Sequence, residues 1–272
     1  RRFLLQDCRL HKISAFRNRF AGVSSRSVGV SISRDSPGPE FSFCRAGASI
    51  SLSRQAILQD EQLRVQCLSA QDRRILSALY DRQEATLAGS TWGLGIVTGD
   101  NRGKLCDCGG DGLEAVYTGR EISEYQLLPP RKFIRFDRTQ LQQAAPDHLY
   151  RAPAKLVYKF ISPRPVFTCD QGQHLFLNSA NMLIPAIPGL DCVTVLAFLN
   201  SQLFRYIYQK QFTDLKVLQG NLLRLPFPAV SSPQNRCLSQ LAQRILAGET
   251  SCRAELEEQV FAAFAVPDRD RD

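Results

Sequence analysis

Residues 155–161 give a strong strand signal, and they limit the folds that the chain can adopt. The segment is rich in β-branched and aromatic residues, which strands favour, and Pro163 and Pro165 end it. A helix is predicted later, at residues 193–210, because apolar residues recur there at helical spacing. They are Leu196, Leu199, Leu203 and Ile207. Because both patterns are clear, we predict a fold of the α/β class with mixed α+β character.

The N-terminal part of the chain predicts a short helix and several strands. An apolar run at residues 3–8 is typical of the last turn of a helix. Residues 9–16 repeat apolar residues at every third position, which fits a helix or a strand. Residues 26–34 alternate and predict a half-buried strand. Its apolar face consists of Val28, Val30 and Ile32. A short strand is expected at 41–44, and residues 45–68 form a connector with little pattern.

A bridging helix and two hairpins are predicted in the middle of the chain. The helix should begin near Ser69, which forms a capping box with Asp72, and should end near Gly89. A tight hairpin turn is predicted before a strand at 113–117. The turn is marked by Gly103, Asp107, Gly109, Gly110, Asp111 and Gly112. A second hairpin is predicted at 166–184, around a Gln-Gly-Gln turn.

Helices are predicted to dominate the C-terminal part. The polar residues Asn200 and Ser201 fall inside the predicted 193–210 helix, where helix propensity alone would not place them. Two more helices are expected after residue 230, because apolar stripes lie at helical spacing. The stripes consist of Leu238, Leu241, Ala242 and Ile245, and of Leu256, Val260, Phe261 and Phe264.

Positive charge is concentrated in two parts of the chain. The net charge is +8, and an excess of this size suggests an anionic partner such as nucleic acid. Residues 1–54 hold ten Lys or Arg against three Asp or Glu, and residues 129–164 hold eight against two. Residues 229–272 are acidic, with five against seven. The +6 of residues 129–164 would be self-repelling without an anionic partner, although the same side chains could instead be dispersed around the domain.

The cysteines do not predict a metal site. There are nine, an odd number with scattered spacing, and the close pair Cys106 and Cys108 has no second pair at zinc-ligand spacing. We therefore expect reduced thiols in a cytoplasmic protein. No secretory signal is recognisable, and no apolar run approaches the roughly 20 residues of a membrane span, so no membrane association is expected.

Five short motifs follow one another in a characteristic order, at residues 92–101, 117–122, 155–159, 199–204 and 222–228. The second contains Gly119-Arg120-Glu121-Ile122, and the last ends Leu-Pro-Phe-Pro. This order resembles the TaqI-like C-terminal specificity domain of adenine-specific DNA methyltransferases. The resemblance implies a domain that reads a target sequence in double-stranded DNA, while a separate N-terminal domain transfers the methyl group.

The resemblance also suggests a domain organisation. Residues 1–68 would be the end of a methyltransferase catalytic domain, the remnant of its Rossmann-like sheet, with a connector. Its characteristic turn would consist of Phe20, Gly22 and Val23. Residues 69–90 would form the bridging helix, residues 91–230 a mixed sheet-and-helix target-recognition domain, and residues 231–272 the C-terminal helices.

Cationic side chains are the candidate DNA contacts. The segment 131–136 interleaves cations with apolar residues, which fits either a groove wall facing phosphates or a strand with solvated basic ends. The candidates are Arg102, Lys104, Arg120, Arg131, Lys132, Arg135, Lys155 and Lys159. We expect the six from Arg120 to Lys159 to lie along one side of the domain.

No catalytic motif is recognisable. Adenine methylation requires a glycine-rich loop for S-adenosylmethionine and an Asn/Asp-Pro-Pro-Tyr/Phe loop for the flipped base. The one Pro-Pro pair, Pro129-Pro130, lies between Leu128 and Arg131. We therefore predict no catalytic, cofactor or metal residues here, and expect S-adenosylmethionine to serve the full-length parent. Two alternatives stay open: a standalone specificity subunit that binds DNA for a separate methyltransferase chain, and a truncated protein without DNA activity.

Overall fold

The computed structural model describes most of the chain, in two compact units. The described residues are 1–16, 27–45, 47–60, 63, 65, 66, 68–212 and 214–266. The N-terminal unit is Arg1–Ser69 and the main unit is Ala70–Asp272. We describe each unit by itself. The turn predicted at Phe20, Gly22 and Val23 lies outside the described residues.

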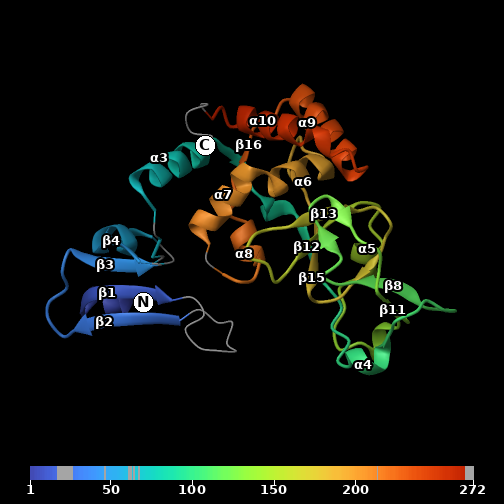
Figure 1. The fold of residues 1–272 in the computed structure, drawn as a ribbon, viewed down its shortest axis with the longest axis horizontal. Helices are drawn as coiled ribbons and strands as arrows, with labels where there is room; N and C mark the ends of the chain where they lie inside the picture. The colour runs from blue at the N-terminus through green and yellow to red at the C-terminus, as the bar shows by residue number, and fades with distance from the viewer. Residues whose placement is uncertain are drawn as a thin grey trace. The chain divides into compact units, whose positions relative to one another are not determined.

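The N-terminal unit is a four-stranded sheet with two short helices (Figure 1, blue). Its elements are α1 (Arg2–Gln6), β1 (Arg9–Phe16), β2 (Ser27–Ser33), β3 (Glu40–Arg45), β4 (Ala48–Ser53) and α2 (Arg54–Gln59). The strand order is β2-β1-β3-β4, and β1 runs antiparallel to β2 but parallel to β3. The short helix and the strands expected at 26–34 and 41–44 are confirmed.

Two expectations for this unit were wrong. The connector contains β4 and α2, and α2 begins where the Ser53 hydroxyl accepts a hydrogen bond from the Ala56 N–H at 3.3 Å. The apolar face of β2 is exposed rather than half-buried within the described residues, with Val28 61% exposed. The reason is that the core of the unit is built by α1, β1, β3, β4 and α2, and none of its buried residues comes from the edge strand β2.

The main unit begins with a helix that is shorter than expected. Helix α3 spans Ala70–Tyr80 and is followed by β5 (Gln83–Ala85), a 3₁₀ turn at Leu87–Gly89 and β6 (Thr91–Leu94). The helix ends before Gly89 because β5 pairs with β16 (Phe227–Pro228), far away in the sequence. The carboxylate of Asp72 accepts a hydrogen bond from the Tyr206 hydroxyl at 2.7 Å and forms an ion pair with Lys210.

Two four-stranded sheets form the centre of the main unit (Figure 1, green to yellow). One has the order β13-β12-β15-β6, from β13 (Phe167–Asp170), β12 (Lys155–Lys159), β15 (Ala180–Ile184) and β6, with antiparallel neighbours. The other has the order β14-β8-β11-β7, from β14 (Leu175–Phe176), β8 (Glu114–Tyr117), β11 (Lys132–Ile134) and β7 (Leu105–Cys106). A shared core of buried residues joins them, including Val116, Ile134, Val157 and Phe176.

Both predicted hairpins were wrong in their strand pairing. Strand β11 lies between β7 and β8, so the glycine-rich turn does not join paired strands. Strand β12 lies between β13 and β15, and β14 joins the other sheet by pairing with β8 in parallel. The strand predicted from residues 155–161 is confirmed as β12, and its pairing on both sides makes it a central strand.

Short elements connect these strands. They are α4 (Asn101–Lys104), β9 (Ile122–Ser123), β10 (Gln126–Leu127), a 3₁₀ turn at Arg138–Gln140 and α5 (Asp147–Tyr150). Strands β9 and β10 pair with each other across a turn formed by Glu124 and Tyr125.

The helix predicted at 193–210 is two helices, α6 (Cys192–Asn200) and α7 (Gln202–Gln211). They meet at Ser201, whose hydroxyl accepts a hydrogen bond from the Phe204 N–H at 3.2 Å and caps α7. The buried Asn200 side chain accepts from the N–H of Phe167 and donates to its carbonyl, at 3.0 and 2.9 Å. The two polar residues therefore end one helix, start the next and tie the junction to β13.

The remaining helices close the main unit, and the two predicted after residue 230 are confirmed. They are α8 (Gln219–Leu222), α9 (Ser232–Leu246), a 3₁₀ turn at Thr250–Cys252 and α10 (Arg253–Ala263). The ring of Phe264, just after α10, packs against Phe198 of α6 and Phe204 of α7. Within the described residues, no helix combines the length and the apolar composition needed to cross a membrane.

Glu124 connects the β9–β10 turn to these helices. Its carboxylate forms ion pairs with Arg164, with Arg205 of α7 at 2.9 Å and with Arg253 of α10 at 3.5 Å. The Arg253 guanidinium also lies 5.4 Å from the ring centre of Tyr125, in cation–π geometry. One carboxylate therefore holds arginines from three parts of the main unit.

Candidate nucleic-acid interface

A tightly bonded turn follows the end of β8. The buried carboxylate of Glu121 accepts hydrogen bonds from the Thr118 N–H and hydroxyl at 2.8 and 2.7 Å. The Arg120 N–H donates to the Thr118 hydroxyl at 3.1 Å, and the Glu121 N–H donates to the Thr118 carbonyl. Burial, with the charges of Asp170 and Glu121, raises the pKa of the preceding Tyr117. Residues 118–121, which we call the Thr118–Glu121 turn, are therefore closed by their own polar groups.

Gly119 holds this turn against a segment sixty residues away in the sequence. Its N–H donates to the Ser179 hydroxyl at 3.0 Å. A Cβ atom at Gly119 would lie 2.7 Å from the Ser179 carbonyl oxygen, closer than a methyl group can approach. That carbonyl also accepts a hydrogen bond from the Phe160 N–H, just after β12. Glycine is therefore required here for the close contact between the two backbones.

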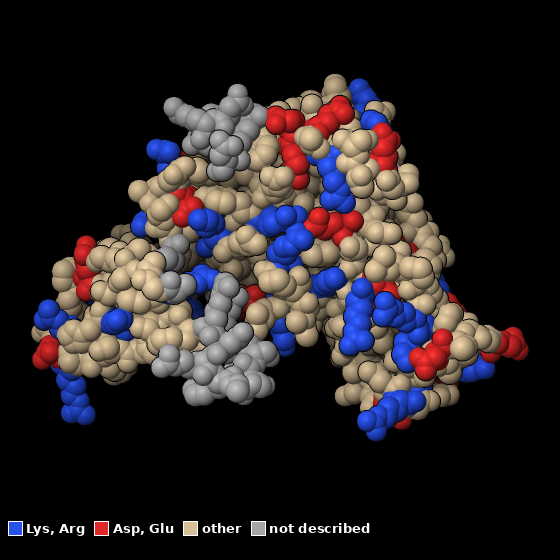
Figure 2. Space-filling model, viewed as in Figure 1, with Lys and Arg blue, Asp and Glu red and all other residues tan. Residues whose placement is uncertain are grey.

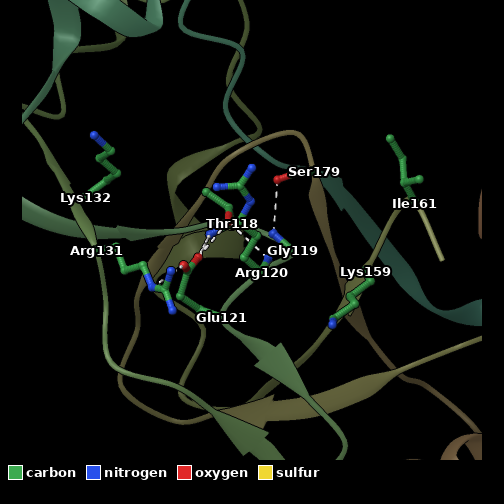
Figure 3. A pocket seen from close by; sticks show the side chains of 9 residues that line it. All are labelled: Thr118, Gly119, Arg120, Glu121, Arg131, Lys132, Lys159, Ile161 and Ser179. Atoms are coloured by element: carbon green, nitrogen blue, oxygen red, sulfur yellow. Dashed lines mark hydrogen bonds and ion pairs between the residues drawn. The ribbon is translucent and has the colours of Figure 1, made fainter. Parts of the chain in front are cut away.

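The turn borders a hollow of about 530 Å³ whose lining is rich in cations (Figure 3). The lining residues are Thr118, Gly119, Arg120, Glu121, Arg131, Lys132, Lys159, Ile161 and Ser179. Figure 2 shows Lys and Arg side chains gathered at the lower right, over the region where Figure 1 places β8, β11 and β15. Four of the eight predicted DNA contacts thus meet in one place: Arg120, Arg131, Lys132 and Lys159.

These four cations differ in their partners. The Arg131 Nε lies 3.7 Å from a Glu121 carboxylate oxygen, and Lys132 forms an ion pair with Asp107. The Arg120 guanidinium and the Lys159 ammonium have no hydrogen bond or ion pair to any residue that the structure describes. Both groups are therefore available to an anionic or hydrogen-bonding ligand.

Lys155 is not a DNA contact, which corrects the prediction for this residue. Its side chain is fully buried, forms an ion pair with Asp170 and donates to the Tyr150 carbonyl at 2.6 Å. Burial lowers the pKa of its ammonium group. Asp170 also accepts from the N–H groups of Gly172 and His174 at 3.0 Å. Because β12 is buried, the Lys155 side chain cannot reach DNA. It instead links β12 to Asp170 of β13 and to the Tyr150 backbone.

The +6 charge of residues 129–164 is also largely compensated inside the main unit, so the argument from self-repulsion was wrong. Carboxylates lie beside most of these cations, and all of them except Asp147 come from outside residues 129–164. Apart from the pairs of Arg131, Lys132 and Lys155, they include Arg138 with Asp147, Arg151 with Glu114 and Arg164 with Glu124. The local count of charges in the sequence therefore overstated the positive field of this region.

The other three predicted contacts lie outside the hollow. Arg102 is exposed on α4, and the Lys104 ammonium donates to the carbonyls of Thr98 and Gln140. The exposed Arg135 donates to the Asp111 carbonyl at 3.3 Å. A DNA contact by any of the three stays a prediction. Within the described residues, no group of three or more His, Cys, Asp or Glu could hold a metal ion.

Residues 114–227 match the TaqI-like C-terminal specificity domain, so the expected resemblance is confirmed for this region of the chain. The matched region contains the Thr118–Glu121 turn, all four cations of the hollow, β12 and α6–α7. This region of the chain is therefore similar to a specificity domain of the TaqI-like type. No curated protein matches the chain.

Three solved structures are similar to this chain. The type IIL restriction-modification enzyme MmeI, solved in complex with DNA, is 8% identical with a TM-score of 0.56, over 97% of this chain and 44% of MmeI. The HsdS subunit from Thermoanaerobacter tengcongensis is 13% identical with a TM-score of 0.40, over 81% of this chain and 61% of its own. The type IIG restriction endonuclease BpuSI is 11% identical with a TM-score of 0.41, over 100% of this chain and 45% of BpuSI. The MmeI alignment establishes a shared fold, and this chain spans less than two thirds of each of the three proteins.

Proposed function

We propose that this chain is the DNA target-recognition portion of a site-specific adenine DNA methyltransferase of a restriction–modification system. The observation that carries the proposal is the hollow at the Thr118–Glu121 turn, where four cations surround a rigid loop inside the TaqI-like specificity domain. The fold shared with MmeI, which was solved in complex with DNA, supports the same partner. Double-stranded DNA in the cytoplasm is the proposed ligand.

The methyl-transfer chemistry is assigned to the rest of the parent protein. The motif order from residue 92 to residue 228 supports an adenine-specific parent, and neither the cofactor loop nor the base-binding loop is recognisable in this sequence. We therefore place the S-adenosylmethionine site and the flipped adenine in an upstream catalytic domain. This chain would supply sequence recognition only.

Binding to duplex DNA should depend strongly on salt concentration. Three or four phosphate contacts at the hollow should give a slope of log affinity against log salt of roughly −3, at about −0.9 for each phosphate neutralised. Lys159→Ala should flatten the slope by about one unit, since this ammonium group has no hydrogen bond or ion pair to any described residue. Fluorescence anisotropy with a labelled duplex at several salt concentrations measures both values.

Arg236→Ala is the matched control for the salt titration. Arg236 is an exposed cation on α9, outside the hollow and in the acidic part of the sequence, so its removal should leave the slope unchanged. A wild-type slope near zero would contradict DNA binding. An unchanged slope in Lys159→Ala would show that the hollow is not part of the DNA interface.

The chain by itself should not bind S-adenosylmethionine. The expectation follows from the missing glycine-rich loop, without which the cofactor has no strand–turn–helix to hold it. Isothermal titration calorimetry of the purified chain should give no binding heat. Stoichiometric binding in the micromolar range would contradict the division of labour between this chain and an upstream domain.

A further inference from the structure

We infer that Arg120 reads a guanine base in the major groove, while the neighbouring cations contact phosphates. The inference rests on the proposed function and goes beyond it by assigning one residue of this chain to one base. Three observations lead to it: the rigidity of the Thr118–Glu121 turn, the Arg120 guanidinium without a partner among the described residues, and the arrangement of the cations around it.

The backbone that carries Arg120 is fixed from both sides. The Arg120 N–H donates a hydrogen bond to the Thr118 hydroxyl at 3.1 Å, and that hydroxyl donates in turn to the Glu121 carboxylate. The preceding Gly119 is bonded to Ser179 and lies in close contact with its backbone. Only the side chain of Arg120 must therefore be ordered on binding, which lowers the entropic cost of a directional contact.

Arg120 is one of the two cations of the hollow, with Lys159, that have no carboxylate partner among the described residues. The Glu121 carboxylate accepts from Thr118 with one oxygen and faces Arg131 with the other, and Asp107 holds Lys132. No carboxylate within the described residues pairs with Arg120, and its side chain is exposed (Figure 3). None of the five N–H donors of its guanidinium is bonded to a described residue, so they can serve a ligand.

The arrangement of cations fits a groove with two phosphate walls. Figure 3 shows Lys132 and Lys159 on opposite sides of the Thr118–Glu121 turn, with Arg120 between them. A major groove presents phosphates along both edges and base edges in the middle. Lysines, as point charges, suit phosphates, whereas the planar fork of arginine matches two acceptors at once. Guanine offers that pair at O6 and N7, while adenine places a donor where O6 would be.

The experiment selects a target and then removes one acceptor at a time. The wild-type chain is used to enrich a pool of randomised duplex oligonucleotides, and the selected duplex is resynthesised with each guanine replaced singly by 7-deazaguanine, which lacks N7. At one guanine, the replacement should lower wild-type affinity roughly tenfold. Arg120→Ala should be insensitive to that replacement and should still respond to replacement of the other guanines. Arg120→Lys keeps one ammonium group that can donate to N7 or O6, so it should respond to that replacement less than the wild type does.

Arg131→Ala is the matched control. Arg131 lines the same hollow but is paired with Glu121, so its removal should weaken binding to all duplexes alike and preserve the guanine preference. The transition of Trp92 fluorescence on unfolding verifies that each variant is folded, because Trp92 is the one tryptophan of the chain and lies in β6.

The outcomes separate the inference from the proposed function. If Arg120→Ala and Arg120→Lys weaken all duplexes equally and keep the full guanine preference, Arg120 is a phosphate contact and the inference is wrong, while the DNA-recognition function stands. If the wild-type chain enriches no sequence, or binds no duplex in a salt-dependent way, the proposed function fails and the inference fails with it.

Discussion

Lys155→Met should lower the free energy of unfolding of the main unit by about 3–5 kcal/mol, which is the usual cost of removing one partner from a buried ion pair. Methionine keeps the length and apolar stem of lysine but leaves the Asp170 carboxylate without its cation. The Asp170 side chain is 1% exposed, so water cannot replace the lost ammonium group. The Tyr150 carbonyl loses its donor as well.

Urea unfolding, monitored by the fluorescence of Trp92, measures this loss of stability in the main unit. Trp92 lies in the same sheet as Lys155, with its ring 6.4 Å from that of Tyr158 of β12, so the signal reports the main unit. Lys159→Met, four residues further along the strand, is the control and should change stability by less than about 0.5 kcal/mol. A change below about 1 kcal/mol in Lys155→Met would mean that Asp170 carries no buried charge.

Glu121→Ala should reduce affinity for duplex DNA roughly 10- to 100-fold, because hydrogen bonds to a charged group contribute about 1.5–3 kcal/mol each. Without the carboxylate, the Thr118 N–H and hydroxyl lose their acceptor, and the turn no longer fixes Arg120. Arg131 loses its nearby carboxylate at the same time. Competition binding against the labelled duplex measures the change.

Glu121→Gln separates the geometric role of this residue from its charge. The amide oxygen can still accept from Thr118, whereas the negative charge beside the phosphates is removed. Affinity should therefore equal or exceed that of the wild type. Equal losses in both variants would show that charge rather than turn geometry decides binding, and the positioning role of Glu121 would have to be abandoned.

The sequence predicted strands and helices better than it predicted their partners. Strand β12 and helices α9 and α10 follow from local patterns, since β-branched residues or apolar stripes mark them directly. Pairing is a different problem, because a strand pattern does not say which strand lies beside it. The glycine-rich turn after β7 suggested a hairpin, but β11, about twenty residues later, occupies the place between β7 and β8. Helix α3 ends earlier than predicted for a similar reason, since the residues after it form β5, whose partner β16 is far away in the sequence.

The candidate site was predictable to a similar extent. The motif Gly119-Arg120-Glu121-Ile122 was visible in the sequence. The carboxylate of Glu121 in this motif could have suggested a turn closed by side-chain hydrogen bonds. Ser179 was not predictable as its partner, because the contact with Gly119 exists only after the chain has folded. Lys155 was misassigned for the same reason: a lysine in an alternating strand looks exposed until Asp170, fifteen residues later, is found beside it.

The contacts of α10 bear on how target specificity could be exchanged between related proteins. The family match ends at residue 227, yet Phe264 packs against Phe198 and Phe204, and Arg253 reaches the Glu124 carboxylate within the matched region. A chimera that carried residues 114–227 alone would pair this domain with foreign helices and leave those rings and that carboxylate without their native partners. The transferable cassette therefore extends through α9 and α10 to residue 266.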